Sequence, residues 1–71
     1  MVYTLTKEEK IDIINQHLKN LEYSKFNSEM SLVEESSVTD PQQNLIDEIQ
    51  GQIDSISAKQ AALLSEIASL G

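Results

Sequence analysis

Cysteine is absent from these 71 residues, and histidine occurs once, as His17. Disulfides and thiolate metal sites are therefore excluded, and one imidazole cannot form the histidine cluster that zinc requires. A chain this short lies near the limit at which a single hydrophobic core outweighs conformational entropy. Oligomerisation is the remaining means of stabilisation, so we expect the chain to associate with itself.

Arginine is absent as well, and five lysines stand against twelve acidic residues, which gives a formal net charge of −7. Binding to nucleic acid depends on Lys and Arg that neutralise phosphates, so direct binding of DNA or RNA is not expected. An anionic membrane surface is disfavoured for the same reason. The sequence also lacks a signal-peptide pattern and an apolar run of about eighteen residues, which predicts a soluble cytoplasmic protein with no membrane contact.

Motifs for catalysis are missing too. The sequence has no glycine-rich phosphate loop and no G-x-S-x-G motif, and Ile14 stands three residues before His17, where a di-iron bundle would have Glu. The adjacent pairs Glu8-Glu9, Glu34-Glu35 and Asp47-Glu48 diverge by about 100° around a helix and cannot form a carboxylate dyad. The sequence therefore predicts a protein that is not an enzyme and uses no cofactor or metal.

What the sequence does contain is helical periodicity. Thr6 and Glu9 have the spacing of a capping box, and residues 7–35 include neither glycine nor proline. Apolar residues then recur at intervals of three and four, which places them on one stripe: Ile11, Ile14, Leu18 and Leu21. We predict a helix over residues 6–35. It follows an arm, residues 1–5, whose apolar Val2, Tyr3 and Leu5 favour docking on a neighbouring chain over fraying.

A second apolar set begins after Leu21 and consists of Tyr23, Phe26, Met30 and Val33. It is rotated from the first stripe by roughly 100° about the helix axis. Either one continuous helix meets different neighbours along its length, or the helix bends near Asn27, where short polar side chains compete for backbone hydrogen bonds. Leu32 lies on the original stripe and favours the continuous helix.

The second helix is predicted over residues 41–70, after a connection at residues 36–40. Asp40 is the expected N-cap, with Pro41 at the first helical position. A 3-4 alternation across four heptads forms its stripe: Ile46, Ile49, Ile53, Ile56, Gln60, Leu63, Ile67 and Leu70. Because the connection is short, the two helices should lie antiparallel. The predicted fold class is all-α, a single-domain antiparallel two-helix hairpin with coiled-coil-like heptads.

The apolar surface of the predicted hairpin is too wide for two helices. Ala61, Ala62 and Ala68 broaden the face of the second helix, while Tyr23 and Phe26 face solvent if only the first stripe meets that helix. A homodimer that forms a four-helix bundle covers both surfaces, with trimers or larger rings as alternatives. The candidate oligomer or partner interface comprises the eight stripe residues of the second helix together with Tyr23, Phe26 and Met30.

Two polar residues carry open interpretations. Gln60 interrupts the stripe, and a buried amide there either fixes the register by demanding a partner or extends to water. His17 is interpreted as a surface or boundary residue, because no second ligand or activated hydroxyl accompanies it.

The leading functional hypothesis is a non-enzymatic, oligomeric helical interaction or assembly protein, whose possible partner besides itself is another protein. The alternative is an acidic regulatory protein that binds or inhibits a nucleic-acid-binding protein through a row of carboxylates: Glu8, Glu9, Asp12, Glu22 and Glu29. A hairpin dimer that binds RNA with a helix face is a third class, and the charge of the chain opposes it.

Overall fold

Thr6 begins the first helix as the sequence predicts. In the computed structural model, which describes residues 4–70, helix α1 spans Lys7–Ser36. The backbone N–H of Glu9 donates to Thr6 Oγ1 at 3.2 Å, and the backbone N–H of Thr6 donates to Glu9 Oε1 at 3.0 Å. The capping box is confirmed. It satisfies two backbone donors that a helix otherwise leaves without partners.

Helix α1 is continuous over its 30 residues, which confirms the continuous-helix interpretation and excludes a break at Asn27. It ends at a serine rather than a glycine. The backbone N–H of Ser37 donates to the carbonyls of Val33 and Glu34, and its Oγ donates to Glu34 O at 2.7 Å. These bonds satisfy carbonyl groups of the last turn, for which the helix has no further N–H donors.

Helix α2 spans Gln43–Leu70, so it begins two residues later than predicted. The first carbonyl to accept intrahelical bonds belongs to Gln42, which receives the N–H groups of Leu45 and Ile46, both at 3.1 Å. The assignment of Asp40 as N-cap and Pro41 as first helical residue is therefore wrong. Both residues lie in the connection, because the chain has to cross from one helix axis to the other before α2 runs beside α1.

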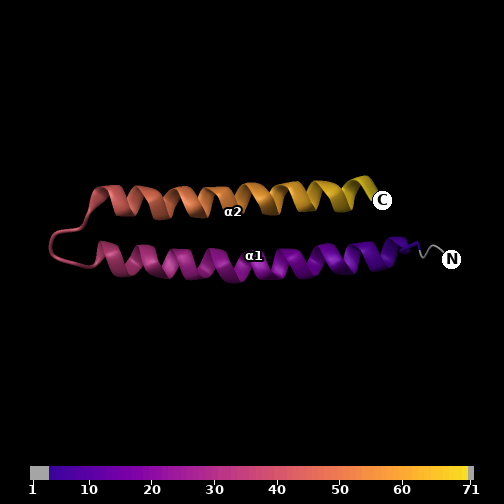
Figure 1. The fold of residues 1–71 in the computed structure, drawn as a ribbon, viewed down its shortest axis with the longest axis horizontal. Helices are drawn as coiled ribbons and strands as arrows, with labels where there is room; N and C mark the ends of the chain where they lie inside the picture. Colours follow the sequence, from indigo (N-terminus) through magenta and orange to yellow (C-terminus); the bar gives the residue numbers. More distant parts are fainter. Residues whose placement is uncertain (1–3, 71) are drawn as a thin grey trace.

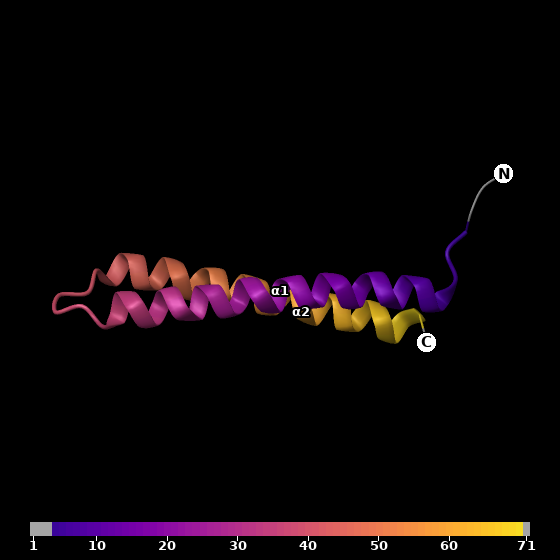
Figure 2. The same cartoon turned by 90° about the horizontal axis from the view of Figure 1, so that it is seen from below.

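The two helices lie side by side and antiparallel (Figure 1). Seen from below, they cross in projection at a shallow angle, as helices do when they wrap around each other (Figure 2). The molecule measures 60 × 19 × 16 Å. Its two short dimensions are those of a single layer of two helices. No third described element covers either face of this layer.

The core follows the line of contact between α1 and α2. Among the described residues, only Ile49 and Ile53 are buried, with 7% and 8% of their surfaces exposed. The other predicted stripe residues of α2 are half-buried, and so are the four apolar stripe residues of α1. The stripe of α1 then continues toward the connection with half-buried residues that are mostly polar: Lys25, Ser28, Leu32 and Glu35.

Removal of the Thr6 hydroxyl tests the capping box. The variant Thr6→Ala is expected to lose about 1 kcal/mol of unfolding free energy, because one backbone donor of α1 loses its acceptor. Urea denaturation followed by circular dichroism at a fixed protein concentration measures the loss. The matched control is Thr4→Ala, at an exposed residue outside the helix. Equal stability of Thr6→Ala and Thr4→Ala would contradict the cap assignment.

Candidate interaction surfaces

Gln60 connects the two helices. Its side chain is half-buried, and Nε2 donates to Glu22 Oε2 on α1 at 2.8 Å. This bond places the middle of α2 beside the middle of α1. The register interpretation requires a hydrogen-bond partner for Gln60, and that partner is Glu22 of the same chain, which remains exposed.

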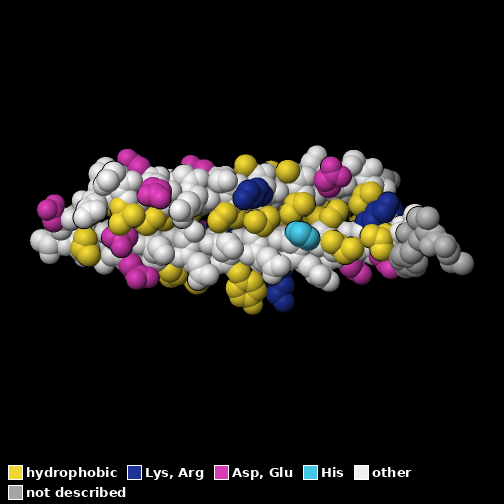
Figure 3. Space-filling model, viewed as in Figure 1, with side chains coloured by type: hydrophobic (Ala, Val, Ile, Leu, Met, Phe, Trp, Pro, Cys, Tyr) yellow, Lys and Arg dark blue, Asp and Glu magenta, His cyan; other side chains and the backbone are white. Residues whose placement is uncertain are grey.

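Three hollows follow one another along the line between the helices and form what we call the inter-helix groove. Leu21 and Lys59 line both the middle hollow and the hollow nearer the connection, while Glu66 lines both the middle hollow and the hollow at the chain ends. Apolar side chains form a yellow band along this line, with the histidine beside it (Figure 3). The groove is therefore one continuous surface.

The composition of the groove changes along its length. At the chain ends it is lined by Leu5, Ile13, Ile14 and Leu70, and nearer the connection it is lined by Ser24, Ser28 and Ser55. Leu5 thus lies against its own hairpin, whereas Val2 and Tyr3 of the predicted arm lie outside the described residues. Lys10 and Glu66 also line the hollow at the chain ends, and Leu21 and Ile56 line the hollow nearer the connection. The half near the chain ends has the larger share of apolar residues, and we call it the apolar half.

Charged and titratable side chains of both signs line the groove. Lys10, His17 and Lys59 are basic or titratable, and Glu66 is acidic. His17 is exposed, as expected for a surface or boundary residue. Three predicted stripe residues of α2 also reach the groove: Ile56, Leu63 and Leu70.

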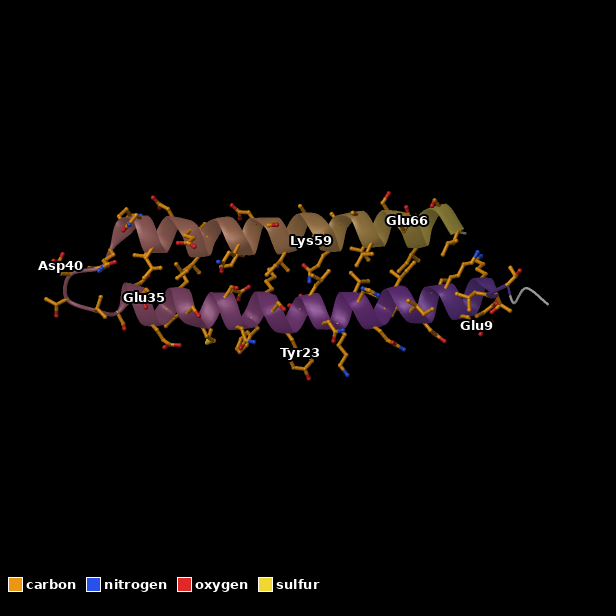
Figure 4. The ribbon with its side chains drawn as sticks, in the orientation of Figure 1. Glu9, Tyr23, Glu35, Asp40, Lys59 and Glu66 are labelled. Carbon is orange, nitrogen blue, oxygen red and sulfur yellow. The ribbon has the colours of Figure 1, made fainter. Side chains whose placement is uncertain are left out.

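A second apolar surface, which we call the outer strip, consists of Tyr23, Phe26, Met30 and Val33. Tyr23 and Phe26 expose 65% and 58% of their surfaces, and the other two are exposed as well. Tyr23 points away from α2 (Figure 4). The expectation that this set faces solvent in a single hairpin is confirmed.

The outer strip and the groove face different directions. On α1 the groove is lined by residues such as His17 and Ser24, and the strip lies roughly 150° from them around the helix axis. A flat partner surface that covers the groove therefore leaves the strip exposed. The sequence predicted the strip but not the groove, because the groove is formed by residues of both helices that lie beside the predicted stripes. The sequence signal for the groove was Ile13, an apolar residue next to Ile14 that the stripe of the first helix does not include.

The row of carboxylates on α1 is engaged in part. Glu9 accepts the N–H of Thr6, Glu22 accepts from Gln60, and Glu29 is half-buried. Glu8 and Asp12 are exposed. Within residues 4–70, no group of three His, Asp or Glu side chains gathers as metal ligands, and neither helix combines the length and apolarity needed to cross a membrane.

Searches against protein-family models, curated proteins and solved structures found no match to this chain.

Replacement of Gln60 by an apolar residue tests whether the polar side chain at this position makes the hairpin less stable than an apolar side chain would. Gln60→Leu is expected to raise the unfolding free energy by about 1 kcal/mol, since it adds apolar contact at a half-buried position and leaves Glu22 solvated. Chemical denaturation measures the change. Gln50→Leu, at an exposed position of α2, serves as control. A loss of stability in Gln60→Leu would mean that the hydrogen bond to Glu22 outweighs apolar packing.

Proposed function

We propose that this chain is a non-enzymatic helical interaction protein that works as a homodimer, in which two hairpins pair through their inter-helix grooves as a four-helix bundle with coiled-coil-like heptads. The outer strip remains free on each hairpin and presents a surface to another protein. The exposed area of the single chain carries this proposal.

A single hairpin exposes more surface than a folded monomer of its size. The chain has a mass of 7.9 kDa and an accessible surface of 5449 Å². The relation between surface and mass for monomeric proteins gives about 4,400 Å², so the excess is roughly 1,000 Å². A standard protein interface buries about 800 Å² on each partner. The excess thus matches the area that one dimer contact removes from water.

The groove suits the dimer contact for two reasons. Its apolar half includes Leu5 and Ile13, which are exposed in the single chain and gain burial on pairing. Its charges are of both signs, so Lys10 of one hairpin can pair with Glu66 of the second copy. A two-fold contact requires such a self-complementary surface.

The first test is the mass of the protein in solution, measured by light scattering coupled to gel filtration. We expect a dimer whose thermal unfolding midpoint rises with protein concentration. Ile13→Glu is expected to weaken the dimer about 100-fold, because it places a carboxylate in the apolar half of the groove. Its circular dichroism at high concentration should remain helical, since Ile13 is 41% exposed in the hairpin.

The matched control is Leu64→Glu. Leu64 is 57% exposed on α2 and is not among the residues that line the three hollows. This variant should keep the mass of the wild-type protein. A monomeric wild-type protein would refute the dimer, and a dimer that Leu64→Glu disrupts and Ile13→Glu leaves intact would move the contact to the other face.

A further inference from the structure

The outer strip has the residue spacing of a coiled-coil seam. Tyr23, Phe26, Met30 and Val33 follow each other at intervals of three, four and three, which assigns them to positions a, d, a and d of two heptads. This seam is separate from the one that faces α2. A surface of this spacing fits the a and d residues of another helix laid along α1.

Carboxylates flank this second seam. In the same heptads, the flanking g positions are Glu22 and Glu29, and the flanking e positions are Asn27 and Glu34. Glu22 lines a shallow hollow with Tyr23, Phe26 and Lys19, and its Oε2 also accepts a hydrogen bond from Gln60 of α2. Three of the four flanking positions are therefore acidic, and Lys19 is the basic residue beside the first turn of the strip.

This charge pattern decides between two occupants. If two outer strips paired with each other, the carboxylates of both copies would flank one seam and repel. A helix with lysine or arginine at its own e and g positions would instead form ion pairs along both sides of the seam. Aromatic residues and methionine, which are three of the four residues of the strip, are typical of interface centres.

We propose that the outer strip binds a basic amphipathic helix of another protein as a short coiled coil of about two heptads. This inference rests on the proposed role as an interaction protein and names the chemistry of the second partner. The strip extends over roughly 15 Å, so three turns of the partner helix cover it. The groove remains available for the homodimer.

A pair of designed peptides tests the proposal with the full-length protein. Both have about three heptads with leucine at a and d, and one carries lysine at e and g where the other carries glutamate. Titration by fluorescence anisotropy at physiological salt should detect binding of the lysine peptide and at least tenfold weaker binding of the glutamate peptide. Phe26→Ser should weaken the lysine peptide at least tenfold, because it removes an aromatic anchor of the seam.

The flanking charges are tested by two double variants of equal net charge. Glu22→Gln with Glu34→Gln should weaken the lysine peptide several-fold, whereas Asp47→Asn with Asp54→Asn, at exposed positions of α2, should leave it within twofold. Equal losses of peptide affinity in both double variants would mean that the peptide is held by the net charge of the protein rather than by the carboxylates beside the seam, which would overturn the proposal. Equal affinity for the two peptides, or no effect of Phe26→Ser, would overturn it as well.

The mass of each variant separates this proposal from the homodimer. A wild-type monomer that binds the lysine peptide refutes the dimer and supports the outer strip. A wild-type dimer that Phe26→Ser converts to a monomer shows that the strip pairs with a second copy, which overturns the basic-helix proposal. A dimer that binds neither peptide retains the groove contact and overturns the strip proposal alone.

Discussion

Every feature of this molecule depends on one geometric constraint, which is that two helices in a single layer share only one line of contact. Each helix buries the side that faces the other, and the remaining surface meets solvent unless another chain covers it. Ile49 and Ile53 are accordingly the two buried residues of the described chain, although apolar residues continue along both helices. The exposed apolar surface follows from the number of layers rather than from poor packing of the seam.

The local features of the hairpin were predictable because short-range chemistry determines them. The Thr6–Glu9 capping box depends on residues three apart, and the α2 stripe depends on periodicity within one helix, so the sequence indicated both. The start of α2 was not predictable in this way. Asp40 and Pro41 form a good helix start by local criteria, but the path between the two helix axes places them in the connection.

The two candidate surfaces differ in predictability for the same reason. The outer strip lies on one helix, so its spacing is visible in the sequence. The groove combines α1 residues such as Ile13 with α2 residues such as Glu66, and their proximity depends on which residues of the two helices stand side by side. The bond from Gln60 to Glu22 spans the two helices in that pairing, and the sequence suggested a role for Gln60 without identifying its partner.

The continuity of α1 explains why its aromatic residues remain outside. A bend near Asn27 would allow the two halves of the helix to turn different faces toward α2, so that both apolar sets were buried. In a continuous helix, turning Tyr23 and Phe26 inward would turn Ile11 and Leu18 outward. The chain turns toward α2 the half-buried stripe that includes Ile11, Ile14, Leu18, Leu21 and Leu32. It therefore accepts the polar Lys25 and Ser28 on the α2-facing side of α1. The outer strip thus has no partner within its own hairpin, and the carboxylates beside it favour a basic helix as the partner that covers it.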